Sequence, residues 1–551
     1  MALRGWICAV GVVVALGCLT SVTLGAPVGS EFQVNTFTTN GQGAPEVAMD
    51  AAGNAVVVWQ SLSQDGSGWG VYGQRYNAAG SPVGGEFQIN TLTTGDQQRP
   101  DVAVASNGTF VVTWESTASA GSDISGWSVQ ARRFDSSGSP QGPEFQVNTF
   151  TASDQLASAV ATTSGGYVVA WQSNQDGAGS GIYGQRYSAA GTPQGGEFQV
   201  NTTTAGDQTI PDVAADGAGD FVLTWASTVS SGPDTSGLSV QARRYDAAGT
   251  AQGPEFQVNT VTANSQDEPQ VAAGGDGSFV IVWSSPNDGD QYGVAAQRYD
   301  AAGAPSGSEF QVNATTSGNQ QSPEVAADTD GDFAVTWQSA TSDGTDNSSN
   351  SVHTRRYART GESQGGEYQV NTFTTGSQQL PAAGMDSDGA AMFVWQSDQQ
   401  DGNSYGVFGQ RDARLPQCGD AKDNDGDGAI DLADPGCSSG TDDSESPDPA
   451  KTATRLTATP AIAQVSGVKL YLFGLTATLT TASNSPLAGR SVSFRAGSTP
   501  LCTAKTGPNG VARCNALTKL LNVTLAQGYT ASFAGDGSYA ASSATAGLIE
   551  L

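Results

Sequence analysis

The sequence predicts an all-β protein whose main part is a seven-bladed β-propeller. Three observations predict it: a motif that recurs seven times, four strand-like segments in each repeat, and an outer strand that the last repeat lacks but that precedes the first. Repeats of roughly 40 to 50 residues with four strands are typical of propeller blades, and seven blades lie within the range that closes into a ring.

The repeated motif is EFQVN or a near copy of it. It begins at Glu31, Glu86, Glu144, Glu197, Glu255, Glu309 and Glu367. A tryptophan ends a β-branched run in each repeat, at Trp59, Trp114, Trp171, Trp225, Trp283, Trp337 and Trp395. The four segments, such as EFQVN, PEVAMD, AVVVWQS and GVYGQRY, are separated by Asp, Gly and Asn residues that favour turns. Each repeat therefore has the pattern of one four-stranded sheet.

An arginine in a QRY-like segment lies 11 residues before the next EFQVN glutamate, as in Arg75 and Glu86 or Arg133 and Glu144. This constant spacing predicts a hairpin, so that EFQVN forms the outer strand of the blade before it. We also expect the arginine and the glutamate to face each other as a cross-strand pair.

The ends of the repeat region complement each other. The last repeat has GQRD up to Asp412 but no EFQVN after it, whereas the EFQVN at Glu31 has no such segment before it. We therefore expect residues 31 to 35 to supply the outer strand of the seventh blade, next to Arg411, and to close the ring.

The repeat resembles the tandem repeats of large bacterial surface and calcium-binding proteins over about residues 27 to 414. The resemblance implies a location and an architecture, and it brings no catalytic residue with it.

Residues 1–26 have a positive start followed by an apolar run that is too short to span a bilayer, which is typical of an export signal. We expect an extracellular or cell-surface protein without a transmembrane helix. The stretch that ends in Cys18 also resembles a lipoprotein box, so an N-terminal lipid anchor at Cys18 is the alternative to free secretion.

The chain is acidic, with 53 Asp and Glu against 23 Lys and Arg and a net charge of -30. Such a charge repels phosphate backbones, which disfavours nucleic acid as a partner. All five lysines follow the repeats: Lys422, Lys451, Lys469, Lys505 and Lys519.

Residues 415–446 contain an Asp-rich loop between Cys418 and Cys437. Carboxylates occupy loop positions 1, 3, 5, 9 and 12, with Gly428 at position 6: Asp423, Asp425, Asp427, Asp431 and Asp434. This spacing curls alternate oxygen ligands around one point, as Ca²⁺ requires. The loop resembles those of thrombospondin type 3 repeats and EF-hand-like dockerins. It predicts bound Ca²⁺; a solvated acidic linker is the alternative.

Residues 451–551 alternate apolar and polar positions, which predicts a small β-sandwich. The order of segments resembles bacterial immunoglobulin-like domains of surface proteins. In an oxidising compartment we expect two local disulfides, Cys418 with Cys437 and Cys502 with Cys514, the second of them between adjacent strands.

The chemistry of the chain favours binding over catalysis. His353 is the only histidine and is expected at the surface, so no Ser/His/Asp or Cys/His arrangement can form. We expect a non-catalytic binding or adhesion protein, not an enzyme, that presents the propeller to an extracellular glycan, matrix or surface protein. Candidate contacts are loop aromatics, which could instead cover the blade edges: Trp69, Tyr72, Trp127, Tyr183, Tyr292 and Tyr405.

The alternative is a propeller glycosidase or another carbohydrate-active enzyme that works with carboxylates alone. Several carboxylates from different blades that converge in one deep central pocket would favour this enzyme, whereas scattered aromatics on a shallow rim would favour binding.

Overall fold

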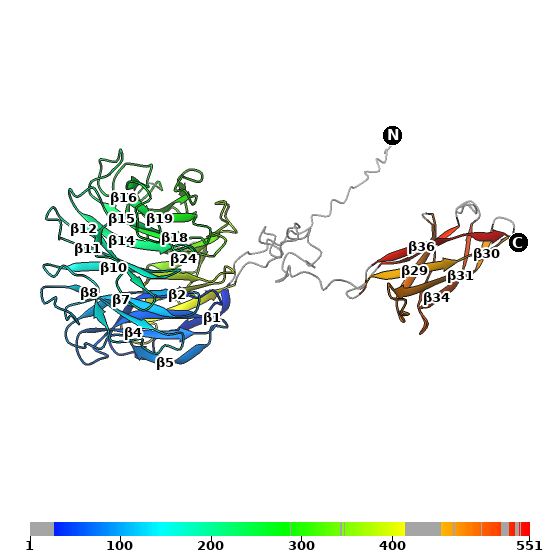
Figure 1. The fold of residues 1–551 in the computed structure, drawn as a ribbon, viewed down its shortest axis with the longest axis horizontal. Coiled ribbons are helices and arrows are strands. Elements are labelled where there is room, and N and C mark those ends of the chain that lie inside the picture. Colours follow the sequence, from blue (N-terminus) through cyan, green and yellow to red (C-terminus); the bar gives the residue numbers. More distant parts are fainter. Residues whose placement is uncertain are drawn as a thin grey trace, which may run out of the picture. The chain divides into compact units, whose positions relative to one another are not determined.

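The computed structural model describes residues 27–413, except 287, 342, 343 and 347, and residues 453–550, except 467, 468, 498, 520–527, 535–538 and 540. The described residues form strands, turns and loops (Figure 1), and no helix among them could cross a membrane. The chain divides into two compact units, Met1–Leu415 and Pro416–Leu551. The predicted export signal with Cys18, and the Asp-rich loop with Cys418 and Cys437, lie outside the described residues.

Seven four-stranded antiparallel sheets, or blades, form the first unit. Blades are numbered in chain order, and their strands are given from the centre of the ring outward. Blade 1 comprises β2 (Gln42–Met49), β3 (Ala55–Leu62), β4 (Trp69–Tyr76) and β5 (Pro82–Gln88); blade 2 comprises β6 (Gln97–Val104), β7 (Phe110–Ser116), β8 (Ser128–Phe134) and β9 (Phe145–Gln146). Blade 3 comprises β10 (Gln155–Thr163), β11 (Gly166–Ser173), β12 (Gly181–Ser188) and β13 (Phe198–Gln199); blade 4 comprises β14 (Gln208–Ala215), β15 (Phe221–Ser227), β16 (Ser239–Tyr245) and β17 (Phe256–Gln257).

Blade 5 comprises β18 (Asp267–Ala273), β19 (Phe279–Ser285), β20 (Gly293–Tyr299) and β21 (Phe310–Gln311); blade 6 comprises β22 (Gln320–Ala327), β23 (Phe333–Ser339), β24 (Ser351–Tyr357) and β25 (Tyr368–Gln369). Blade 7 comprises β26 (Gln378–Met385), β27 (Ala391–Asp398), β28 (Tyr405–Asp412) and, from the start of the chain, β1 (Pro27–Gln33).

The ring closes as the sequence predicts. Strand β1 pairs antiparallel with β28, which sets Val28 opposite Arg411 and Phe32 opposite Gly409. The innermost strands β26 and β2 contact each other, as β2 and β6 do, so the last blade packs on the first. The all-β propeller fold and its closure by the N-terminal strand are therefore confirmed.

The core of the ring lies between neighbouring blades. The second strand is buried along its whole length in several blades, and its tryptophan is at most 1% exposed in all seven blades. Because each blade buries both faces, every second strand has a continuous apolar run instead of alternation.

The predicted pair between the repeated arginine and glutamate is wrong. The register of β4 and β5 places Arg75 opposite Val83, with a bulge between this pair and Gly73. Arg75 Nη1 instead donates to the carbonyl of Ser136 in blade 2, 2.9 Å away. Glu86 accepts hydrogen bonds from the backbone N–H and the hydroxyl of Thr36, in the link between blade 7 and blade 1. Both residues therefore connect neighbouring blades, and the 11-residue spacing repeats because the blade junctions repeat.

The second unit is a β-sandwich. One sheet contains β29 (Thr454–Thr459), β31 (Lys469–Thr481), β30 (Ala461–Ser466), β37 (Leu548–Glu550) and, on the other edge of β31, β34 (Val511–Lys519). The other sheet has the order β33 (Thr499–Lys505), β32 (Ser491–Ala496), β35 (Tyr529–Phe533) and β36 (Ser542–Ala546). Residues of both sheets share one core, which includes Leu472, Leu479, Phe494 and Tyr529.

The predicted disulfide between Cys502 and Cys514 is present, with a Cα–Cα distance of 6.5 Å. Its position differs from the prediction, because Cys502 lies on β33 and Cys514 on β34, which belong to different sheets. The bond therefore fastens the two layers of the sandwich together and does not join hydrogen-bonded neighbours.

Candidate active site

The innermost strands of the seven blades surround a central channel. Each of these strands begins where a link arrives from the previous blade and ends at a tight turn into the second strand. We call the first end of the channel the loop mouth, because the longer loops between second and third strands also lie there. The other end, with its short turns, is the turn mouth.

A β-bulge interrupts every innermost strand near the loop mouth. The bulged residue has a left-handed φ between 45° and 53° although none of the seven is glycine: Ala44, Arg99, Ala157, Ile210, Glu268, Ser322 and Leu380. Such a backbone costs on the order of 1 to 2 kcal/mol per residue and persists where the surroundings impose it. The bulge ring therefore holds seven strained positions at one level of the channel.

Hydrogen bonds between blades hold these bulges. In most blades the residue after the repeated tryptophan accepts the bulge N–H of the next blade, as Gln60 Oε1 does from Arg99 at 3.0 Å and Gln396 Oε1 does from Ala44 at 3.0 Å. In blade 5, Glu268 Oε2 accepts from the N–H of Ser322 at 2.8 Å instead. Blade 4 has Ala226 at this position, and the N–H of Glu268 is bound by Asp267 Oδ1 instead. The strain of the bulges is thus offset by contacts between neighbouring blades.

Carboxylates from four blades converge two residues further into the channel. In each blade, the residue at this level of the innermost strand pairs with the residue that precedes the tryptophan on the second strand. The seven residues are Glu46, Asp101, Ala159, Asp212, Gln270, Glu324 and Ala382. The four acids, Glu46, Asp101, Asp212 and Glu324, are half-buried. We call these four side chains the carboxylate ring.

Burial and mutual repulsion change the protonation of this ring. Burial, together with the charge of Asp212, raises the pKa of Asp101 to about 7, although hydrogen bonds from the N–H groups of Val160 and Val102 oppose the shift. Burial also raises the pKa of Asp212 to about 7, against hydrogen bonds from Val271 and Val213.

The two glutamates are shifted further. Burial raises the pKa of Glu46 well above its usual range, and the charges of Asp101 and Asp212 add to the shift. Burial and the charge of Glu46 do the same to the pKa of Glu324. Glu324 accepts a hydrogen bond from Gln270 Nε2 at 2.8 Å, whereas Glu46 has no hydrogen-bond donor among the described residues. At neutral pH the ring therefore holds protonated and ionised carboxyl groups side by side.

These carboxyl groups can supply a general acid and a carboxylate base or nucleophile at one place. Acid–base catalysis on a glycosidic bond uses such a pair of groups. Within the described residues, no group of three or more His, Cys, Asp or Glu side chains lies close enough to hold a metal ion.

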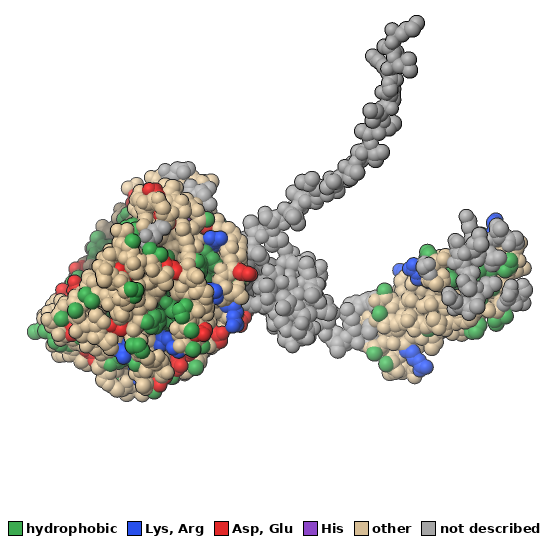
Figure 2. All heavy atoms as spheres, turned by 90° about the horizontal axis from the view of Figure 1, so that it is seen from above, with side chains coloured by type: hydrophobic (Ala, Val, Ile, Leu, Met, Phe, Trp, Pro, Cys, Tyr) green, Lys and Arg blue, Asp and Glu red, His purple; other side chains and the backbone are tan. Residues whose placement is uncertain are grey.

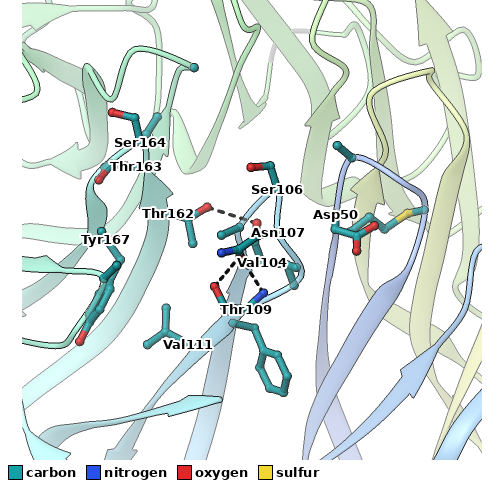
Figure 3. Close-up of a pocket in the computed structure, with 18 of the residues that line it drawn as sticks. Asp50, Val104, Ser106, Asn107, Thr109, Val111, Thr162, Thr163, Ser164 and Tyr167 are labelled. Atoms are coloured by element: carbon teal, nitrogen blue, oxygen red, sulfur yellow. Dashed lines mark hydrogen bonds between the residues drawn. The ribbon is translucent and has the colours of Figure 1, made fainter. Parts of the chain in front are cut away.

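A cavity of about 840 Å³ opens at the turn mouth. Thr162, Thr163 and Ser164 lie on one side of it in Figure 3, Asp50 lies on the other, and Asn107 lies between them. Blade 3 leaves this space open because its turn is one residue shorter than that of blade 4. Tyr167 follows Val160 by seven positions, whereas Phe221 follows the equivalent Val213 by eight.

The carboxylate ring does not line this cavity. The residues at its innermost level, such as Met49 and Val104, come three positions after the carboxylates, which places them roughly 10 Å further along the strand. The cavity at the turn mouth therefore does not reach the carboxylates.

The aromatic contacts predicted from the sequence are only partly accessible. Tyr72 and Tyr183 are 6% and 5% exposed within the blade cores, so their prediction as surface contacts is wrong. Trp69, Trp127, Tyr292 and Tyr405 are half-buried near the loop mouth, where a role in binding stays a prediction.

His353 is also buried, contrary to the surface position we expected. Its Nδ1 lies 3.6 Å from Glu367 Oε1, and its Nε2 lies 3.0 Å from the hydroxyl of Ser351.

No family model matches the chain, and no curated protein matches it. Similar solved structures include a protein of unknown function from Dyadobacter fermentans, with 10% identity over 71% of this chain and 99% of that one and a TM-score of 0.43. They also include the GH93 α-L-arabinofuranosidase of Fusarium graminearum, with 10% identity, 70% and 98% coverage and a TM-score of 0.40. An α-L-arabinanase of Penicillium chrysogenum has 12% identity, 69% and 98% coverage and a TM-score of 0.38.

Two expectations are corrected here, namely a non-catalytic binding or adhesion protein and the absence of enzyme activity. The similar solved propellers include glycoside hydrolases. Independently of that distant likeness, the innermost strands of four blades carry carboxyl groups with raised pKa values, which favours the carbohydrate-active alternative. Sequence reasoning assigned these acids to turns and strand pairs and so missed them.

Proposed function

We propose that the protein is a carbohydrate-active enzyme, a glycoside hydrolase that works with the carboxylate ring and takes its substrate from the loop mouth. The observation that carries the proposal is the convergence of Glu46, Asp101, Asp212 and Glu324, from four different blades, with raised pKa values. Carboxyl groups that stay protonated near neutral pH are the acids that cleavage of a glycosidic bond requires.

Glu46 is the general acid in this proposal. It is half-buried, its pKa is raised, and no donor of the described protein fixes its oxygens, so its proton is free to pass to a leaving-group oxygen. Glu324, which Gln270 Nε2 orients, is the second carboxylate that activates water or attacks the sugar carbon. Asp101 and Asp212 accept backbone N–H groups of blades 3 and 5, and act mainly through their charge.

The surroundings favour a neutral glycan. Anionic sugars would meet repulsion from the carboxylates, and Arg99 is the one arginine in the bulge ring. The repeated arginines are engaged elsewhere, since they donate to backbone carbonyls of the next blade, as Arg133 does to Ala189 at 2.9 Å. Ile210 and Leu380, exposed in the bulge ring, add apolar surface on which the faces of a sugar can pack.

The test is hydrolysis of a panel of neutral polysaccharides and aryl glycosides by the full chain, followed by Glu46→Gln and Glu324→Gln on any substrate that is cleaved. Each variant should lower kcat by at least ~100-fold, because it removes an acid or base that contributes to the transition state. Glu362→Gln, on an exposed turn outside the channel, removes the same charge and should leave kcat unchanged.

Thermal unfolding of all three variants distinguishes a variant that has lost activity because it is unfolded from one that has lost only a catalytic group. Cleavage that survives both channel substitutions, or a chain that cleaves no substrate of the panel, would contradict the proposal.

We further propose the setting of this enzyme from its sequence. Residues 1–26 support export to the outside or the surface of a bacterial cell, with a lipid anchor at Cys18 as the alternative. The spacing of Asp423, Asp425 and Asp427 supports a Ca²⁺ site that stiffens the joint after the propeller. The order of segments in residues 451–551 supports an immunoglobulin-like module.

A further inference from the structure

The C-terminal sandwich differs in charge from the rest of the protein. Residues 451–551 contain eight Lys and Arg against two Asp and Glu, a net charge of +6 in a chain whose total is -30. The face of this unit visible in Figure 2 carries hydrophobic and basic side chains, and no acidic side chain of the described residues is seen on it. Partners that the acidic propeller repels can therefore approach the sandwich.

An apolar patch lies on the outer face of the five-stranded sheet. Phe473 on β31 stands opposite Ile462 on β30, which stands opposite Ile549 on β37, and the three are between 40% and 55% exposed. In the next row Leu517 on β34, 58% exposed, stands opposite Tyr471. The ring of Tyr471 lies parallel to that of Phe473, with centroids 6.3 Å apart. Five apolar side chains from four strands thus form one continuous surface.

The side chains of this patch point outward from the sheet and do not belong to the core of the sandwich. The residues that alternate with it along the strands, Ala463, Leu470 and Leu472, are fully buried and pack in the shared core. Five of the eleven exposed large hydrophobic side chains of the described protein belong to this small unit. Soluble proteins seldom expose a contiguous patch of this kind without a partner for it.

Basic side chains flank the patch. Lys469, two residues before Tyr471 on β31, and Arg513, four residues before Leu517 on β34, are exposed on the same face by the alternation of the strands. Arg455 is exposed on β29, which pairs with β31. The outer face therefore combines an apolar centre with cations on more than one side.

We infer that this face docks the protein on an anionic phospholipid bilayer. Aromatic and aliphatic side chains enter the boundary between headgroups and acyl chains, while lysine and arginine pair with the phosphates. The net charge of the propeller keeps it away from such a surface, so the sandwich is the part of the chain that makes contact.

Two other occupants fit the face less well. A second copy of the same face would bring like charges together. A glycan would need several hydrogen-bond donors and acceptors around the aromatic rings. Gln464 stands opposite Tyr471, but the other neighbours, Ile462, Leu517 and Ile549, are aliphatic.

The experiment is co-sedimentation of the full mature chain with vesicles of phosphatidylcholine alone or mixed with phosphatidylglycerol. We expect at least ~10-fold tighter binding to the mixed vesicles at low salt, and weaker binding as the ionic strength rises. The double variant Phe473→Ser/Leu517→Ser should lose roughly tenfold or more of that affinity, since it removes inserted apolar surface. Lys469→Gln/Arg513→Gln should lose affinity and most of the salt dependence.

Ile124→Ser, at a residue 97% exposed in a propeller loop, is the matched apolar control, and Arg359→Gln in the propeller is the matched charge control; both should bind as the wild type does. Equal binding to both kinds of vesicle, or undiminished binding by the Phe473/Leu517 variant, would overturn the inference. Binding to a soluble polyanionic polysaccharide but not to mixed vesicles would also overturn it and assign the face to a glycan. Because none of these readouts uses hydrolysis, the result is independent of the proposed enzyme activity.

Discussion

Glu31 in the first strand of the ring accepts hydrogen bonds from the backbone N–H and the hydroxyl of Thr372, which lies 341 residues later in the chain. The N–H contact recurs at the other blade junctions, and the hydroxyl contact recurs at some of them, for example between Glu86 and Thr36 and between Glu197 and Thr149. The junction that closes the ring is therefore built like the six junctions that follow the order of the chain.

Replacing Glu31 tests the closure. We expect Glu31→Ala to lower the free energy of unfolding by about 0.5 to 1.5 kcal/mol, because it removes the carboxylate that accepts from the N–H and hydroxyl of the exposed Thr372. Glu86→Ala, at an equivalent junction, should cost a similar amount. Urea denaturation followed by tryptophan fluorescence measures both. A neutral Glu31→Ala beside a costly Glu86→Ala would mean that the closing junction contributes nothing.

The carboxylate ring predicts how stability depends on pH. Asp101 and Asp212 have pKa values of about 7 in the folded protein, above the value near 4 of an unfolded chain. The folded state thus holds protons that the unfolded state has lost, and this contribution to stability falls as the pH rises from about 4 to about 7. Asp101→Asn should remove the part of that slope that Asp101 contributes and raise the free energy of unfolding at about pH 8 by roughly 1 to 2 kcal/mol, after allowance for screening by channel water.

The difference between the wild type and Asp101→Asn is the quantity to measure, over a series of pH values. Other carboxyl groups have the opposite slope: burial raises the pKa of Glu367, but hydrogen bonds from His353, Thr315 and Ala314 outweigh it and lower that pKa to about 2. A variant whose advantage over the wild type is as large at low pH as at high pH would contradict the pKa assignment.

A buried ion pair replaces aromatic packing between blades 6 and 7. Asp412 Oδ2 accepts from Arg356 Nε at 2.8 Å and from the hydroxyl of Tyr368 at 2.6 Å, and both charged side chains are at most 4% exposed. Asp412→Ala should cost about 3 to 5 kcal/mol, because it leaves a buried guanidinium without its partner. Thermal and chemical unfolding report the loss.

The other junctions suggest a matched control for this pair. They pack a phenylalanine on an aromatic ring of the next blade, as Phe310 packs on Tyr357 with centroids 5.4 Å apart. Asp412→Tyr/Tyr368→Phe restores that combination and should be less destabilising than Asp412→Ala. If the double variant is less stable than Asp412→Ala, the surroundings require the hydrogen bonds of Asp412 to Arg356 and Tyr368, and these bonds do not merely substitute for aromatic packing.

The disulfide between the sheets of the sandwich should stabilise that unit. Cys514→Ser should lower its unfolding free energy by roughly 2 to 4 kcal/mol, since Cys502 and Cys514 close a loop with a separation of 12 residues. Unfolding of the full chain, observed with and without reductant, should show one transition that shifts while the propeller transition stays in place. A reductant-insensitive wild type would refute the stabilising role.

Calcium removal tests the Asp-rich loop. We expect one Ca²⁺ per chain in a titration, and loss of that binding in Asp425→Asn/Asp427→Asn, because the variant removes two charged ligands of one loop. The matched variant Asp386→Asn/Asp388→Asn, in a blade turn that resembles the loop only at a glance, should bind as the wild type does. Equal affinity in both variants would contradict the assignment.

The fold was predictable because its causes are local and repeated. A tryptophan after a β-branched run predicts a buried second strand wherever it occurs. The first EFQVN segment, at Glu31, and the last GQRD segment, at Asp412, each lack a partner within their own repeat, and this predicts the closure. The partners of Arg75 and Glu86 were not predictable, since a constant spacing along the chain does not reveal whether two residues meet within a blade or between blades.

The carboxylate ring was hidden for a different reason. Each of its acids follows a proline in the innermost strand and resembles a strand-pair residue when its repeat is read alone. The usable signal was variation at a position with constant neighbours: Glu46, Asp101, Asp212 and Glu324 alternate with Ala159, Gln270 and Ala382. A position that only supports the repeat has no reason to vary in this way, whereas a position that faces a ligand does.

The pairing of β1 with β28 sets a condition on biogenesis. The first strand to leave the ribosome has no native partner until the last strand of the ring has been synthesised, so no complete ring can form on a partial chain. A contact between such distant parts of the chain also makes folding slow. The chain consequently remains open for most of its synthesis, which is the state in which a polypeptide can be threaded through a membrane pore before it folds on the other side.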